Sequence, residues 1–116
     1  MEIAQLAPNL FVGAQIAEED LVTLAREGFT DIVCNRPDAE HPETASSASM
    51  AQIAKGLGIA FHYLPIIPGE PFPEQARRLA AVVAEPAAKV FAYCRSGARA
   101  ANAWALAQTN QSGIYA

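Results

Sequence analysis

The chain has 116 residues and a formal net charge of −4, and hydrophobic residues make up 52% of it against 17% charged ones. This length suits one domain with its own core and is too short for two, so residues 1–116 are expected to form a single unit. The negative balance disfavours nucleic acid or an anionic membrane as partner, and without a long apolar run or more than two cysteines the chain is expected to be cytoplasmic.

The first half of the chain alternates short apolar runs with one amphipathic stretch. A strand is predicted at 10–13, and a helix is predicted at 17–28, with acidic residues in its first turn and Gly28 as its stop. The next apolar run predicts a strand at 29–35. Residues 36–47 contain two prolines and no hydrophobic period, which indicates a loop.

The second half repeats the alternation of helices and strands. A helix is predicted from about 47 to 57, followed by a strand at 59–65 and a loop at 66–72. The remaining predicted elements are a helix at 73–84, a strand at 90–93 and a helix at 98–108. This order predicts a three-layer α-β-α fold, with a mainly parallel four-stranded sheet and helices on both faces. Ligands bind such sheets beyond the carboxyl ends of the strands.

The segment 94–99 carries the strongest functional signal. It reads Cys-Arg-Ser-Gly-Ala-Arg and joins the predicted strand 90–93 to the predicted helix 98–108. Backbone N–H groups of such a turn, together with the positive end of a helix, form a cradle for an anion. With the Arg99 guanidinium they favour the thiolate form of Cys94. We therefore interpret Cys94 as a nucleophile and Arg99 as the residue that clamps the anion.

The other residues of this segment are candidates for substrate binding. Arg95 either recruits an anionic substrate or is simply solvated. Ser96 either donates to the bound anion or caps the following helix. Gly97 supplies an unusual backbone conformation or allows a close approach of the ligand. Ala98 completes the binding loop through its backbone amide.

A second group of candidates follows the predicted strand 29–35. Asn35 and Arg36 either shape the pocket, with Arg36 helping to capture the anion, or belong to a solvated loop. Cys34 is either a small buried residue or a resolving thiol that forms a reversible disulfide with Cys94. No metal-ligand spacing is present among the histidines and cysteines, so neither a metal nor another cofactor is expected.

Four segments of the chain carry a family resemblance. They are Leu-Phe-Val-Gly-Ala-Gln at 10–15, Ile-Val-Cys-Asn-Arg-Pro-Asp at 32–38, His-Tyr-Leu-Pro at 62–65 and Tyr-Cys-Arg-Ser-Gly-Ala-Arg at 93–99. Through them nearly the whole chain resembles the phosphatase-like domain of beta-lactamase hydrolase-like proteins. The resemblance implies the compact fold of dual-specificity phosphatases. It also implies a persulfide dioxygenase-like partner, because such domains occur fused to a metallo-hydrolase-like domain of that type.

Two departures from the phosphatase pattern bear on the chemistry. Phosphatases of this type carry Cys-x5-Arg, whereas Cys94 and Arg99 are separated by four residues, as in single-domain rhodaneses. The tighter ring of amides suits a persulfide better than a phosphoryl group. The loop that supplies the general acid in phosphatases follows the third predicted strand, and here Glu70 is its only carboxyl group. Tyr93 also stands where phosphatases usually carry a histidine.

These features lead to three functional hypotheses, each with a small anionic or sulfane-sulfur ligand. The preferred one is a sulfurtransferase, in which Cys94 takes sulfur from thiosulfate or a low-molecular-weight persulfide and carries it as a persulfide. The alternative is a phosphatase that forms a cysteinyl-phosphate, with Arg99 on the phosphoryl oxygens and Glu70 as the acid. The third is a redox-sensing or anion-binding module in which Cys34 and Cys94 switch between thiol and disulfide.

Overall fold

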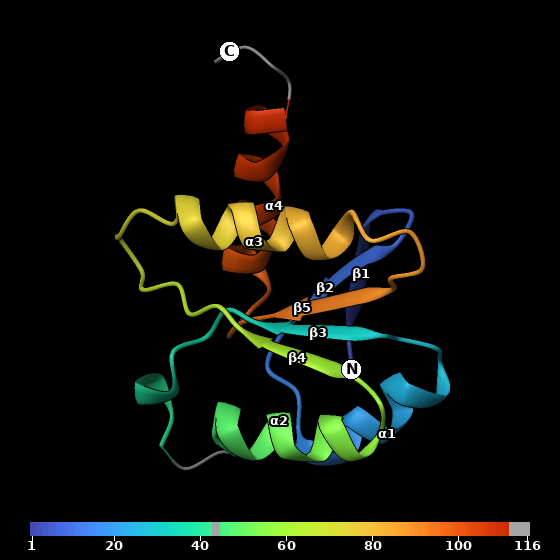
Figure 1. Ribbon diagram of the computed structural model, residues 1–116. Coiled ribbons are helices and arrows are strands. Elements are labelled where there is room, and N and C mark those ends of the chain that lie inside the picture. Colours follow the sequence, from blue (N-terminus) through green and yellow to red (C-terminus); the bar gives the residue numbers. More distant parts are fainter. Residues whose placement is uncertain (43–44, 112–116) are drawn as a thin grey trace.

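The computed structural model describes residues 1–42 and 45–111 as one α/β unit (Figure 1). Its strands are β1 (Ile3–Ala7), β2 (Leu10–Gly13), β3 (Asp31–Cys34), β4 (Ala60–Tyr63) and β5 (Val90–Tyr93). Its helices are α1 (Glu18–Arg26), α2 (Ser47–Gly56), α3 (Pro73–Val83) and α4 (Ala98–Gln111), with a single 3-10 turn, η1 (Asp38–Glu40). None of the described helices has the length and apolarity needed to cross a membrane.

The strands form one sheet in the order β1-β2-β5-β3-β4. The central strand β5 pairs in parallel with β2 and β3, and β4 lies parallel to β3 at one edge. Helices α1 and α2 cover one face of the sheet, and α3 and α4 cover the other (Figure 1). The predicted fold class is therefore confirmed. The predicted strand count was one too low, because β1 adds an antiparallel strand at the other edge.

Strand β5 shows why the sheet needs a helical layer on each face. Its side chains alternate between the faces, as in any strand. Phe91 and Tyr93 belong to the core under α1 and α2, whereas Val90 and Ala92 belong to the core under α3 and α4. All four side chains are buried. A parallel strand covered on both faces has to be apolar throughout, and this explains the unbroken apolar run in the sequence.

The register of β3 and β5 brings two functional loops together. Cys34 at the end of β3 pairs with Tyr93 at the end of β5, and the backbone N–H of Asn35 donates to the Tyr93 carbonyl at 2.8 Å. The loops that follow, 35–40 and 94–99, therefore start side by side at the carboxyl edge of the sheet. This is the edge at which parallel sheets bind ligands.

Candidate active site

Cys94 lies at the base of the loop that joins β5 to α4. The residue is fully buried, and the backbone N–H of Gly97 donates to its Sγ atom at 3.0 Å. Gly97 turns its amide inward because its φ is +97°, a conformation that favours glycine. An N–H aimed at sulfur supports negative charge there. The loop thus holds the candidate nucleophile next to a donor that stabilises an anion.

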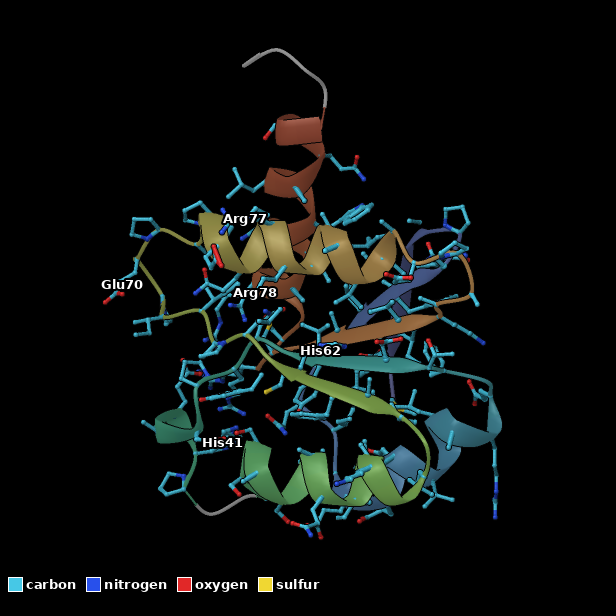
Figure 2. All side chains as sticks on the ribbon, viewed as in Figure 1. His41, His62, Glu70, Arg77 and Arg78 are labelled. Carbon is cyan, nitrogen blue, oxygen red and sulfur yellow. The ribbon has the colours of Figure 1, made fainter. Side chains whose placement is uncertain are left out.

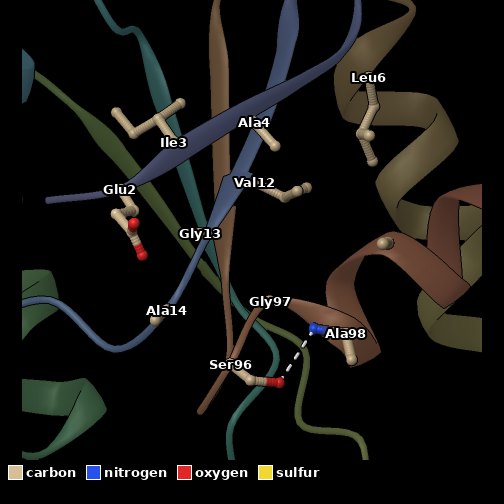
Figure 3. Close-up of a pocket in the computed structure, with 11 residues that line it drawn as sticks. Glu2, Ile3, Ala4, Leu6, Val12, Gly13, Ala14, Ser96, Gly97 and Ala98 are labelled. Carbon is tan, nitrogen blue, oxygen red and sulfur yellow. Dashed lines mark hydrogen bonds between the residues drawn. The ribbon is translucent and has the colours of Figure 1, made fainter.

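The remaining loop residues begin α4. Ser96 accepts a hydrogen bond at its Oγ from the backbone N–H of Ala98, at 3.3 Å (Figure 3). This contact caps the helix, one of the two roles considered for Ser96. Ala98 and Arg95 are exposed, so both are accessible to a ligand from solvent.

Arg99, in the first turn of α4, makes the densest set of polar contacts in the site. Its Nη1 donates to Glu40 Oε2 at 2.6 Å and to the Ile66 carbonyl at 2.9 Å, and its Nη2 donates to Glu40 Oε1 at 2.8 Å. The hydrogen bonds to Glu40 are the main cause of a raised pKa for Arg99, and the nearby Cys94 acts in the same direction. Arg99 is therefore a fixed cation that neighbours the candidate nucleophile.

A cavity of about 450 Å³ opens over these residues. Its lining consists of Arg36, Glu40, Pro68, Arg95 and Arg99. The fold thus brings together the three arginines that the sequence singled out, although Arg36 is about sixty residues away along the chain. Among the described residues, three guanidinium groups against one carboxylate give the cavity lining a positive balance, in a chain whose net charge is negative. Such a cavity attracts small anions.

A second cavity of about 580 Å³ lies between β1, the end of β2 and the first turn of α4 (Figure 3). Its lining includes Ser96, Gly97 and Ala98, so residues of the loop 94–99 line both cavities. Of the described residues on this lining, Glu2 is the single one with an ionisable side chain, and most of the others are apolar. This second cavity therefore lacks the charge that an anionic substrate needs.

Asn35 and Glu70 do not line the cavity with the arginines. Asn35 is fully buried, and its Nδ2 donates to the Leu64 carbonyl at 2.8 Å. It therefore helps to hold the segment after β4 in place, and its role in substrate binding stays a prediction. Glu70 is exposed at the tip of the loop before α3, where its side chain points away from the sheet (Figure 2). Pro68 is the residue by which this loop reaches the cavity.

Cys34 is buried on the α1 and α2 side of β3, and both cysteines are free thiols. Its Sγ donates to the Arg36 carbonyl at 3.4 Å, and the side chain of Tyr93 lies close enough to act on its pKa. Burial raises the pKa of Cys34, and it likewise raises the pKa of the Tyr93 hydroxyl. Because a thiol attacks as its thiolate, this environment disfavours Cys34 as a resolving nucleophile. The disulfide with Cys94 remains a prediction.

Sequence reasoning missed Glu40, whose carboxylate contacts two of the three arginines. Besides Arg99, it accepts from Arg36 Nε at 3.2 Å. The hydrogen bond from Arg99 is the main reason why the pKa of Glu40 lies below its ordinary value, and Arg36 adds to the effect. The sequence held one signal, since Arg36 and Glu40 are four residues apart. Nothing in a loop of unknown path, however, indicated a contact with Arg99.

The comparisons with known proteins agree with this geometry. The model of the phosphatase-like domain of beta-lactamase hydrolase-like proteins matches residues 2–111. Beta-lactamase hydrolase-like proteins of Xylella fastidiosa and Agrobacterium fabrum are each 25% identical to the chain over 108 residues, which cover 93% of it and 25% of the relative. The chain thus spans about a quarter of the length of the curated relatives it matches.

Several solved structures share the fold. A candidate phosphatase from Neisseria meningitidis superimposes with a TM-score of 0.80 at 25% identity, covering 95% of this chain and 78% of that one. A candidate phosphatase from Shewanella putrefaciens has the same TM-score at 20% identity, and the match covers 98% of this chain and 74% of that one. Kinase associated phosphatase, with its catalytic-site cysteine replaced by serine, superimposes with a TM-score of 0.66 at 17% identity. The match covers 86% of this chain and 67% of that one. The last two comparisons concern the fold alone.

Proposed function

The chain belongs to the family of phosphatase-like domains of beta-lactamase hydrolase-like proteins, and we propose that it is a cysteine-dependent phosphatase acting on small phosphate monoesters. The observation that carries the proposal is the arrangement around Cys94. The Gly97 amide donates to its sulfur, Arg99 neighbours it, and Arg99 lines a cavity together with Arg36 and Arg95. The similarity to a candidate phosphatase at 25% identity supports the same chemistry.

The proposed reaction has two steps. The Cys94 thiolate attacks phosphorus, so that a sulfur–phosphorus bond forms while the bond from phosphorus to the leaving oxygen breaks. Water then attacks the cysteinyl-phosphate, which releases inorganic phosphate and restores the thiolate. Arg99 binds two phosphoryl oxygens through its forked guanidinium, and the loop amides stabilise the charge that gathers on them in the transition state.

The leaving oxygen needs a proton unless it departs as a stable anion. Glu40 is unsuited to this task, because its contacts with Arg99 and Arg36 keep the carboxylate ionised. We retain Glu70 as the proposed acid, since Pro68 of the same loop already lines the cavity. Aryl phosphates with good leaving groups do not need the acid, and they are therefore the substrates of choice for a first assay.

Hydrolysis of p-nitrophenyl phosphate tests the proposal. The wild-type chain is expected to release p-nitrophenol, and Cys94→Ser is expected to lose this activity, because a serine hydroxyl is a far weaker nucleophile than a thiolate. Lys55→Gln, a substitution on the helix α2 outside the cavity, serves as the control and is expected to keep full activity. Turnover in the wild type that does not exceed that of Cys94→Ser would contradict the proposal.

Sulfur transfer is the second candidate, and two observations favour it. Four residues separate Cys94 from Arg99, one fewer than in the phosphatase pattern, and the exposed Glu70 does not line the cavity with the arginines. Persulfide formation does not require an acid for an alkoxide leaving group. Incubation with thiosulfate followed by intact-mass measurement distinguishes this candidate from the first. A gain of about 32 Da that Cys94→Ser lacks supports it, and an unmodified wild-type mass argues against it.

A further inference from the structure

The carboxylate of Glu40 binds Arg99 in the way that a substrate would. Two roughly parallel hydrogen bonds, at 2.6 and 2.8 Å, join the two oxygens of Glu40 to Nη1 and Nη2 of Arg99. This forked contact is the geometry in which arginine binds carboxylate and phosphate groups. The two outer nitrogens of Arg99 are therefore already engaged before any substrate arrives.

A second arginine, Arg36, also contacts the Glu40 carboxylate, which is therefore held as a bound anion would be. Arg36 Nε donates to Glu40 Oε1 at 3.2 Å, so one carboxylate oxygen lies between two guanidinium groups. Arg36 is itself held in place, because its Nη1 donates to Gln15 Oε1 at 3.3 Å. Only 11% of the Arg36 side chain and 17% of the Arg99 side chain are exposed. The two cations form a built anion site, and Glu40 occupies it.

The turn that carries Glu40 is anchored from two directions. The carboxylate of Asp38 accepts hydrogen bonds from the backbone N–H and the hydroxyl of Ser47, both at 2.8 Å. The backbone N–H of Asp38 donates to the hydroxyl of Tyr63 at 3.0 Å. The Glu40 side chain, at 25% exposed, reaches solvent more than the arginines it contacts. Its carboxylate can therefore swing out into solvent while the backbone of η1 stays in place.

The burial of Cys94 shows that part of the site must move before chemistry. The nucleophile is 0% exposed, and Arg99 beside it holds Glu40. A phosphorus atom has to reach the sulfur while its oxygens take the guanidinium. The carboxylate and the phosphoryl group compete for the same donors on Arg99, so both cannot hold them at once.

We propose that Glu40 is a specificity-determining residue, an internal anion that a substrate must displace from Arg99 and Arg36. The proposal rests on the function proposed above. A ligand with a single negative charge only replaces one monoanion by another, so the exchange yields little net binding free energy. A phosphate monoester with two negative charges is attracted more strongly than Glu40 by both arginines, so it can displace the carboxylate. Glu40 thus selects dianionic phosphoryl groups against carboxylates and phosphodiesters, by penalising ligands that interact too weakly to displace it.

Binding of inorganic phosphate at pH 8, measured by calorimetry, tests this proposal without requiring turnover. Glu40→Gln is expected to lower the Kd for phosphate by about tenfold, because the apparent affinity of the wild type is reduced by the fraction of molecules whose site is open. Acetate, a monoanion, is expected to bind measurably to Glu40→Gln and not to the wild type. Glu40→Asp keeps the charge but has a shorter side chain, and its Kd for phosphate is expected to lie between those of the wild type and Glu40→Gln. It also provides a second variant should Glu40→Gln fold poorly.

Glu74→Gln is the matched control. Glu74 also contacts two arginines, Arg77 and Arg78, but on the exposed surface of α3. Its substitution changes the net charge equally and is expected to shift the Kd less than twofold. An unchanged or higher Kd in both Glu40 variants would overturn the proposal and show that Glu40 positions Arg99 for binding. An equal gain in Glu74→Gln would overturn it as well, since net charge would then explain the effect. Tighter phosphate binding without any phosphatase activity would refute the proposed function alone.

Discussion

At the scale of single residues, the loop 94–99 depends on one backbone conformation. Gly97 has a φ of +97°, and this turns its N–H toward the sulfur of Cys94. The Gly97 backbone also packs against β2, because a Cβ atom added to it would lie 3.4 Å from the backbone carbon and oxygen of Gly13. The conformation itself favours glycine here, which ties the shape of the anion cradle to one residue.

Gly97→Ala is accordingly expected to lower both stability and activity. A non-glycine residue in the left-handed region costs about 1–2 kcal/mol. A displaced amide moreover misplaces the reacting groups, so kcat/KM for p-nitrophenyl phosphate should fall by roughly tenfold or more. Urea unfolding and steady-state kinetics measure the two effects. Gly56→Ala is the control, because Gly56 lies in α2 and an added Cβ there would meet nothing within 4 Å. Equal activity in both variants would contradict this account of the loop.

The candidate site was predictable from the sequence where it is local and unpredictable where it depends on distant contacts. Cys94 and Arg99 belong to one continuous motif whose spacing carries its own chemical meaning. Glu40 contacts Arg99 across 59 positions of sequence, and only the register of β3 and β5 brings their loops together. Burial likewise keeps Asn35 off the lining of the cavity with the arginines, and burial is a property of the folded chain.

At the scale of elements, helix α4 positions Arg99 through its small residues. Ala100, Ala103 and Ala107 are buried, and the first two belong to the core between the sheet and α3. Alanine allows the helix axis to approach its neighbours closely. The first turn of α4, which holds Arg99, is therefore fixed by packing along the helix behind it.

Ala103→Leu tests this dependence. Enlarging a fully buried side chain in a packed core costs about 1–3 kcal/mol, and the helix can relieve the clash by moving outward. That movement should raise the KM for p-nitrophenyl phosphate, since Arg99 is carried with it. Ala105→Leu places the same side chain on the exposed face of α4 and is expected to change stability by less than about 0.5 kcal/mol. A loss of stability in Ala103→Leu with an unchanged KM would show that the packing of α4 does not determine the position of Arg99.

The elements that escaped prediction are those with the weakest local signal. Strand β1 lies at the sheet edge, and three of its five residues are exposed, so it lacks the apolar run by which the other strands were found. Its pairing with β2 defines it, and pairing is not visible in sequence. The turn η1 contains three residues, too few to show any hydrophobic period. Both omissions therefore have the same cause, a dependence on tertiary contacts.

At the scale of the whole molecule, the candidate site draws on both helical layers. Arg36 and Glu40 lie in the connection that leads to α2 on one face, whereas Arg95 and Arg99 lead into α4 on the other. Each face has its own buried core, and the sheet separates the two. The three arginines can converge only while both layers are docked, so loss of either core should open the site.

Leu24→Ala tests whether the two helical layers unfold together, because it weakens the layer on the face of the sheet opposite α4. Leu24 is fully buried in the core under α1 and α2, and its truncation is expected to cost about 2–5 kcal/mol. Trp104, the single tryptophan, packs in the opposite core and reports on α4 through its fluorescence. In a cooperative domain the substitution shifts the fluorescence transition and the far-ultraviolet circular dichroism transition by the same urea concentration. If the fluorescence midpoint stayed at its wild-type value while the dichroism midpoint moved, the layers would unfold separately. Arg95 and Arg99 would then remain folded without Arg36 and Glu40, and phosphate binding would be lost before α4 unfolds.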